Sequence, residues 1–322
     1  MQRNELILTD EEIKDCLHKN WKIKIHTLSY VPAGSTFGFK ITLQNNSVVF
    51  LKIYKMFKAA KAIDRPNPQA LPVLGHVLHK LKNIYKFDYF PRIIATHTAH
   101  WFYEMQDYCF FLFDYIEGES PTYTPNTLNM LDFAKIVAML HQIPMQAFPE
   151  LAIERFDLNY VGGLTQWLNP IHPTMDAIGL DMIMQLRAWH NNIKKGLRTL
   201  ELLREHVLGL HLPFVITHGD PHYKNIMQTP QKIYLLDWDN LKIAPKERDL
   251  WFYEFGPFKA VYERHGSSPP IHSDVCRFYQ VQRFFEDIRF YLEQTDCSIA
   301  QRKEYLKCFI NHWGWNYCAS IE

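Results

Sequence analysis

The sequence lacks an excess of charge of either sign. Its 322 residues include 35 Lys and Arg against 34 Asp and Glu, which gives a net charge of +1. The basic residues form no stripe, so we expect no nucleic-acid partner. An acidic excess is missing as well, which counts mildly against a polycationic ligand.

Cysteine pairs, repeats and long apolar runs are also missing. The six Cys, at 16, 109, 276, 297, 308 and 318, form no C-x-x-C pair, so we expect reduced, mostly buried thiols in a cytoplasmic protein. No apolar run approaches the length of a membrane span, and no apolar stretch follows a basic start, so we expect no membrane association. The length allows two lobes, each with its own core.

Residues 214–239 carry the clearest pattern in the chain. Apolar runs at 214–217, 226–228 and 232–236 alternate with polar or Pro-containing turns, which predicts three short strands. Polar side chains follow the strand ends, on loops of the kind that usually carry chemistry. These residues are His218, Asp220, Asn225, Asp237 and Asp239.

This spacing suits the transfer of a phosphoryl group from ATP to a hydroxyl. Such a reaction needs a carboxylate that orients the hydroxyl and accepts its proton, and hard oxygen ligands for magnesium. Asp220 can be that carboxylate. Asn225 and Asp237 can bind the metal, with Asp239 assisting. We expect His218 to brace the loop by hydrogen bonding rather than to titrate.

A zinc hydrolase is an alternative interpretation of the same loop. His218, Asp220 and His222 have side chains that zinc sites use. This alternative leaves Asn225 and Asp237 without a role, and the sixteen His of the chain make chance clusters easy.

Two strings define the motif of this region: His-Gly-Asp-Pro-His-Tyr-Lys-Asn at 218–225 and Leu-Leu-Asp-Trp-Asp at 235–239. In this motif the chain resembles the kinase-like aminoglycoside and choline phosphotransferases. Shorter strings at 244–250 and 285–288 are most similar to the spectinomycin phosphotransferase branch. The resemblance implies a two-lobe, protein-kinase-like α+β fold. We therefore expect an N-terminal nucleotide-binding lobe of antiparallel sheet over 1–115 and a larger, mainly helical catalytic and acceptor-binding lobe over 116–322.

The resemblance also implies where ATP binds. Gly34, Ser35 and Thr36 lie in a turn that would place backbone N–H groups and hydroxyls near the phosphates. Lys52 interrupts the apolar strand predicted over 48–54, and because a buried ammonium is costly, contact with the phosphates would explain it. Backbone groups near Asp114 and Ile116 would bind the adenine edge.

The partner of Lys52 departs from the family pattern. A Glu on the next helix normally pairs with this lysine, but residues 54–101 contain no Glu, and the helix offers His76 and His79 instead. Unless Asp64 reaches Lys52, we expect phosphates alone to hold it. This departure leaves open a catalytically weak nucleotide-binding scaffold that acts on a protein partner.

Helical spacing predicts core helices over 127–142 and 275–293. In the first, we expect His141 to be a satisfied packing residue. We expect Asp249 to be a structural brace. On the second helix, Glu286 and Asp287 are adjacent acids, which usually form a solvated face, but the resemblance implies that one of them faces the acceptor.

The predicted protein is thus a monomeric kinase that uses ATP and Mg²⁺ on a hydroxyl of a small molecule. An aminocyclitol such as spectinomycin is the first choice of acceptor. Other aminoglycosides, a choline-type alcohol or a sugar are the alternatives.

Overall fold

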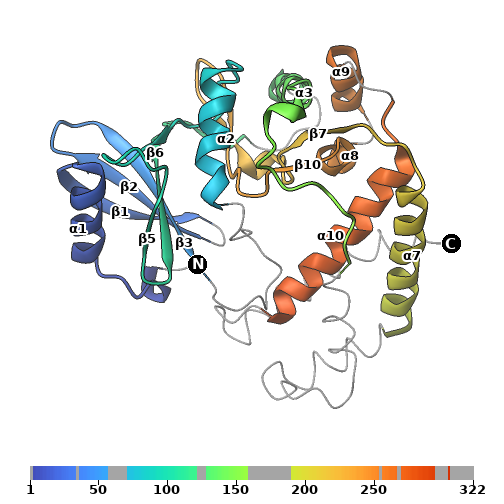
Figure 1. The fold of residues 1–322 in the computed structure, drawn as a ribbon, viewed down its shortest axis with the longest axis horizontal. Helices are drawn as coiled ribbons and strands as arrows, with labels where there is room; N and C mark the ends of the chain where they lie inside the picture. The colour runs from blue at the N-terminus through green and yellow to red at the C-terminus, as the bar shows by residue number, and fades with distance from the viewer. Residues whose placement is uncertain are drawn as a thin grey trace.

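A computed structural model describes residues 3–33, 36–56, 71–121, 128–158, 190–253, 256–266, 270–293 and 304. A small lobe built on an antiparallel sheet stands beside a larger, mainly helical lobe (Figure 1). The predicted two-lobe, kinase-like α+β class is therefore confirmed. Among the helices of the described ranges, none combines the length and the apolar character that crossing a membrane would require.

The small lobe begins with η1 (Arg3–Glu5) and helix α1 (Asp10–Trp21), which starts with a capping box. The Thr9 hydroxyl accepts the backbone N–H of Glu12, and the Glu12 carboxylate accepts the backbone N–H of Thr9 at 2.8 Å. Both contacts satisfy donors that the first helical turn leaves unpaired. The apolar face of α1 packs with β2 and β3 in one core.

The sheet of the small lobe has the order β1-β2-β3-β6-β4, and β5 pairs with β6. All of these pairs are antiparallel. The strands are β1 (Ile25–Ala33), β2 (Thr36–Leu43), β3 (Val48–Lys55), β4 (Ile93–Ile94), β5 (Tyr103–Met105) and β6 (Tyr108–Asp114). The turn between β1 and β2 is shorter than the sequence predicts, because Thr36 already belongs to β2. Gly38 lies inside β2. A Cβ there would approach the Val31 carbonyl oxygen to 2.7 Å, so glycine lets β1 and β2 pack closely.

Helix α2 (Leu71–Asn83) follows the sheet and presents two different faces. Leu74 and Leu78 are buried in the core that continues into the large lobe. His76 and His79 are exposed and lie against Trp101, which donates its indole N–H to His76 Nδ1 at 3.2 Å.

The large lobe contains the two core helices predicted from helical spacing. The one over 127–142 is α3 (Leu128–His141), which packs against α9 (Pro257–His265), and the one over 275–293 is α10 (Ser273–Glu293). Helix α10 lies beside α7 (His190–Leu208), and the two share a core (Figure 1). Shorter helices are η2 (Met145–Ala147), η3 (Tyr223–Asn225), α8 (Glu247–Leu250) and η4 (Trp251–Tyr253).

Two short ribbons carry the pattern at 214–239. Strand β7 (Phe214–Thr217) pairs with β10 (Lys242–Pro245), and β8 (Ile226–Gln228) pairs with β9 (Ile233–Leu235). The three predicted strands are confirmed, with the third slightly shorter than expected, and β10 was not predicted. The ribbons fix both ends of the loop at 218–225, so its side chains have defined positions.

The described cysteines agree with the expectation of reduced thiols. Cys16, Cys109 and Cys276 are free and buried. Burial raises the pKa of Cys16 to about 11, so this thiol stays protonated at neutral pH. Positions 297, 308 and 318 lie outside the described residues.

Candidate active site

A cavity of about 600 Å³ brings together most of the residues that the sequence singled out. The small lobe and the hinge after β6 supply part of its lining, and the loops at the ends of β7 and β9 supply the rest. The predicted site residues that line it are Lys52, Asp114, Ile116, Asp220, Asn225 and Asp237.

His218 is a brace, as predicted. Its buried ring accepts the Asp220 backbone N–H at Nδ1, at 3.2 Å, and donates from Nε2 to the Leu236 carbonyl, at 2.9 Å. Burial lowers the pKa of His218, which favours this neutral form. Both ring nitrogens are therefore occupied by backbone partners, which counts against a zinc ligand at His218 and against the zinc hydrolase interpretation.

Asp249 of α8 also braces the loop at 218–225, as predicted. Its carboxylate accepts the backbone N–H groups of His218 at 2.7 Å and of Gly219 at 2.6 Å. His141 donates to it from Nε2 at 3.1 Å and accepts the Tyr262 hydroxyl at Nδ1, so His141 is a satisfied packing residue. Burial favours the neutral acid, but contacts with His141 and nearby positive charge keep the pKa of Asp249 below its usual value.

Position 219 requires a glycine, because of its backbone conformation and its close neighbours. Its φ of +90° is a conformation that side chains disfavour, and a Cβ would lie 2.4 Å from the Arg248 guanidinium. Arg248 in turn donates to Thr217 and to the Asn240 carbonyl, so it cannot easily move aside. The turn that presents Asp220 is therefore tightly enclosed.

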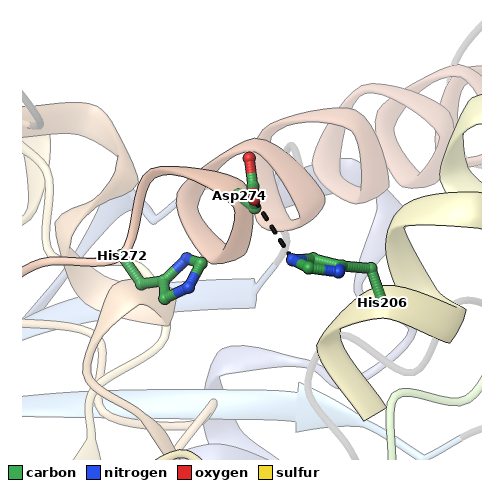
Figure 2. Close-up of side chains that lie close together, drawn as sticks. All are labelled: His206, His272 and Asp274. Carbon is green, nitrogen blue, oxygen red and sulfur yellow. Dashed lines mark ion pairs between the residues drawn. The ribbon is translucent and has the colours of Figure 1, made fainter. Parts of the chain in front are cut away.

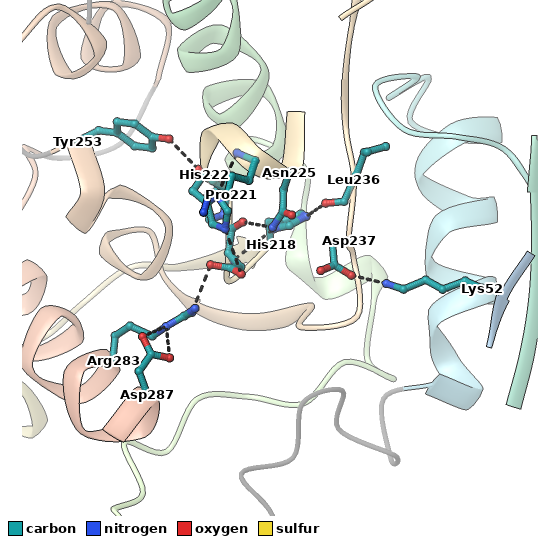
Figure 3. A network of polar contacts seen from close by, with 12 residues as sticks. Lys52, His218, Pro221, His222, Asn225, Leu236, Asp237, Tyr253, Arg283 and Asp287 are labelled. Carbon is teal, nitrogen blue, oxygen red and sulfur yellow. Dashed lines mark hydrogen bonds and ion pairs between the residues drawn. The ribbon is translucent and has the colours of Figure 1, made fainter. Parts of the chain in front are cut away.

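Asp220 and Asn225 are held together by the loop itself (Figure 3). The Asn225 Nδ2 group donates to the backbone carbonyl of Asp220 at 2.9 Å, which leaves the Asn225 side-chain oxygen for another partner. The Tyr253 hydroxyl donates to the Pro221 carbonyl at 3.1 Å and fixes the middle of the loop. These contacts are made by the backbone of the loop, and Asp220 is one of the residues that line the cavity.

Lys52 has protein partners, which corrects the expectation that phosphates alone would hold it. Its ammonium is ion-paired with Asp237 and lies 3.3 Å from Asp239 Oδ2 (Figure 3 shows the first contact). We call Lys52, Asp237 and Asp239 the nucleotide-side cluster. Burial opposes charge on Lys52, but the two carboxylates outweigh it and hold the pKa of Lys52 well above its usual value.

Helix α2 does not supply the missing Glu. Leu74 and Leu78 point into the cavity, while His76 and His79 lie on the other face. Asp64, the other candidate for Lys52, lies outside the described residues.

In the nucleotide-side cluster, the single positive charge of Lys52 lies beside two carboxylates. Burial favours the neutral acid at Asp237, but Lys52 lowers its pKa to about 2. Burial and the charge of Asp237 raise the pKa of Asp239 to about 7. One ammonium thus serves two carboxylates, which together with the Asn225 oxygen form a hard-oxygen donor set that fits a magnesium ion.

The backbone of Asp237 has an unusual conformation. Its φ of +66° is unusual for a residue with a side chain. Such strain costs free energy and persists where the surroundings impose it, often at active sites. Here it follows the end of β9 and turns the carboxylate toward Lys52.

The remaining nucleotide residues are only partly located. Gly34 and Ser35 lie outside the described residues, and the buried Thr36 hydroxyl donates to the Ala33 carbonyl at 2.8 Å. The Asp114 side chain forms a two-pronged ion pair with Arg92, and its N–H donates to the Arg92 carbonyl. Only the backbone carbonyl of Asp114 is therefore left for an adenine amino group.

On the other side of Asp220 lies an arginine that sequence reasoning missed. Arg283 of α10 donates from Nη1 to Asp220 Oδ1 at 3.2 Å and from Nε to both oxygens of Asp287 at 3.0 Å (Figure 3). We call Asp220, Arg283 and Asp287 the acceptor-side cluster. Burial opposes the charge, but the carboxylates raise the pKa of Arg283 further above its already high value.

Comparison with known proteins identifies the family. The model of the phosphotransferase enzyme family matches residues 53–255, more than half of the chain, and this range contains the loop at 218–225 and Asp237 but begins just after Lys52. This protein belongs to the phosphotransferase enzyme family. A sequence comparison with curated proteins gives no match.

Solved structures show that this phosphotransferase has the fold of its family. Spectinomycin phosphotransferase APH(9)-Ia, in complex with ADP and spectinomycin, superposes with a TM-score of 0.74 at 17% identity, over 98% of both chains. The amicoumacin kinase hAmiN reaches 0.61 at 9% identity, over 98% of this chain and 93% of its own. Choline kinase LicA from Streptococcus pneumoniae reaches 0.59 at 13% identity, over 97% and 99%.

The sequence of this phosphotransferase does contain a signal for Arg283. It stands four residues before Asp287, a spacing that places both side chains on one side of a helix. It also follows Val281 and precedes Phe284, both buried, so an arginine there needs a nearby counter-ion. That the counter-ion includes Asp220 could not be inferred from spacing.

Proposed function

We propose that this phosphotransferase transfers the γ-phosphoryl group of ATP to a hydroxyl of a small molecule. The observation that carries the proposal is the meeting of Lys52, Asp220, Asn225 and Asp237 around one cavity between the lobes. Phosphoryl transfer depends mainly on positioning and charge stabilisation, so a carboxylate, hard oxygen donors and a cation in one cavity are the groups it needs.

Each residue has a role that its contacts support. Asp220, on a loop braced through its backbone, orients the acceptor hydroxyl and accepts its proton. Asn225 and Asp237, with Asp239 behind them, hold magnesium, which when bound supplies positive charge to the phosphates. Lys52 leaves its carboxylates when the nucleotide arrives and contacts the phosphates.

The nucleotide base has a place beside the hinge after β6. Phe50, Phe113 and Met227 line the same cavity and give it apolar walls. We propose that the Asp114 carbonyl and the Ile116 backbone bind the adenine edge, and that the turn at Gly34, Ser35 and Thr36 covers the phosphates.

For the acceptor, we propose an amine-bearing aminocyclitol such as spectinomycin. The acceptor-side cluster has two carboxylates for one guanidinium, and Glu286 adds another negative charge that acts on Arg283. This negative charge favours a cationic acceptor, although the whole chain is nearly neutral. The likeness to a spectinomycin phosphotransferase agrees with this choice, and choline is the alternative.

The structure weakens the alternative of a catalytically weak nucleotide-binding scaffold. The missing Glu suggested an unsupported Lys52, but Asp237 and Asp239 take that place. A lysine held in the cavity by the metal-binding carboxylates is compatible with turnover, because magnesium and phosphates can exchange with it.

The test is ADP release from Mg-ATP by the full chain, with spectinomycin, other aminoglycosides, choline and small sugars as acceptors. We expect one acceptor to stimulate release and to gain the mass of one phosphoryl group, and Asp220→Ala to abolish the stimulation. ATP binding without stimulated release by any member of the panel would contradict the proposed acceptors. Equal release by Asp220→Ala would contradict the assigned chemistry.

A further inference from the structure

His206, His272 and Asp274 form a cluster away from the cavity. His206 lies in the last turn of α7, and the other two lie where α10 begins (Figure 2). Each side chain offers one ligand atom, and these three atoms all lie within 4.8 Å of one another. We propose that this cluster binds a transition-metal dication such as Zn²⁺, at a site separate from the predicted magnesium site.

The distances suit such an ion. His206 Nε2 and Asp274 Oδ2 are 3.2 Å apart. Two ligands with bonds of about 2.1 Å on a tetrahedral ion lie roughly 3.4 Å apart, so this pair already has the required separation. The His206 and His272 ring centroids are 6.3 Å apart, which small side-chain rotations can shorten.

His272 supplies a second, independent indication. Its Nδ1 is shielded from solvent and has no hydrogen-bond partner in the part of the chain that the structure describes. A shielded polar atom without a partner costs free energy unless something satisfies it. Its backbone is held from both sides, because its N–H donates to Glu247 at 3.0 Å and its carbonyl accepts from Cys276 at 3.0 Å. The backbone that carries the imidazole is therefore fixed close to the other two ligands.

The ligand types indicate the class of metal. Two imidazoles and one carboxylate suit Zn²⁺, Co²⁺, Ni²⁺ or Cu²⁺, whereas Mg²⁺ prefers oxygen ligands alone. Three protein ligands leave a fourth position for water. A bound ion would link the end of α7 to the start of α10, the helix that carries Arg283.

The two outer ligands can be changed without disturbing a core. The side chains of His206 and Asp274 are 50% and 53% exposed. Zn²⁺ is titrated calorimetrically into the full chain, stripped with chelator and kept in excess Mg²⁺ so that magnesium occupies its own site. We expect one equivalent to bind, and His206→Gln and Asp274→Asn each to weaken binding by more than about tenfold.

Matched controls separate this site from general histidine binding. His26→Gln, on an exposed part of β1, and Asp132→Asn, whose side chain is 55% exposed on α3, should bind Zn²⁺ like the unmodified chain. Co²⁺ should give visible absorption bands that His206→Gln removes. Absence of saturable binding would overturn the site, and so would equal binding by the His206 and Asp274 variants. Neither result depends on the kinase reaction.

Discussion

Two clusters of charge flank the loop at 218–225, and each has one cation shared by two carboxylates. In the nucleotide-side cluster the cation, Lys52, comes from the small lobe, 185 residues away from its partner Asp237. In the acceptor-side cluster the cation, Arg283, shares its helix with Asp287 and contacts the loop through Asp220. The first therefore depends on how the two lobes meet, and the second on one helix of the large lobe.

The clusters also differ in how open their carboxylates are. The Asp237 side chain is 41% exposed while its neighbour Asp239 is 6% exposed, so a metal can reach the first directly. In the acceptor-side cluster both carboxylates are mostly covered. We infer that the nucleotide-side cluster exchanges its cation during the reaction, whereas the acceptor-side cluster keeps Arg283 in place.

The largest expected effect is at Asp220, the member of the acceptor-side cluster that lies on the loop. Asp220→Asn removes the proton acceptor, so kcat should fall by about 10²- to 10⁴-fold. The thermal midpoint should fall only slightly, because the backbone contacts that brace the loop remain and Arg283 keeps Asp287 as an ion-pair partner. The measurement is acceptor-dependent ADP release beside a thermal melt, with Asp132→Asn as control. A near-normal kcat would show that Asp220 is not the base.

The next effect tests exchange in the nucleotide-side cluster. Lys52→Met removes a cation from the phosphates, so kcat/KM for ATP should fall by about 10²- to 10³-fold. The same change frees Asp237 and Asp239, so Mn²⁺ should bind more tightly when no nucleotide is present. Lys14→Met, on the exposed face of α1, is the control. Unchanged Mn²⁺ affinity would mean that Lys52 does not compete with the metal.

A third effect concerns the brace that both clusters share. Asp249→Asn removes the negative charge and leaves one oxygen acceptor for two backbone N–H donors, so it should lower the free energy of unfolding at pH 7 by about 2–3 kcal/mol. The folded state holds the pKa of Asp249 below its unfolded value of about 3.9. Its stabilisation is therefore complete above that pH and is lost as pH falls through the lower, folded-state pKa.

Urea unfolding at pH 7 and at pH 3 measures this dependence. The difference in stability between the unmodified chain and Asp249→Asn should shrink at the lower pH. A constant difference would mean that the charge of Asp249 contributes nothing to the brace.

The smallest effect tests whether Arg283 stays in place. Arg283→Met removes the guanidinium that holds Asp220 and Asp287 in position, so KM for the acceptor should rise by about tenfold, equivalent to 1.4 kcal/mol, with KM for ATP unchanged. Arg283→Lys should recover part of the loss, since it keeps the charge but not the two-pronged contact. Arg198→Met, on exposed α7, is the control. An equal rise in both KM values would assign Arg283 to the fold of the loop rather than to the acceptor side.

The elements that sequence reasoning located are those with local signals. The capping box at Thr9 and the helices over 127–142 and 275–293 follow from spacing within a few turns. Strand β10 was missed because Lys242–Pro245 is short, contains one Lys and ends in Pro, so it has no strand signal apart from its pairing with β7.

The sequence by itself determined the reaction class, because Asp220, Asn225 and Asp237 keep a fixed spacing on loops between short strands. It also determined that Lys52 lacks the usual Glu. Only the tertiary structure decided which carboxylate pairs with Lys52 in place of that Glu and which cation pairs with Asp220. Those partners, Asp237 and Arg283, are 185 and 63 residues away along the chain, and an ion pair depends on distance in space, which no local pattern encodes.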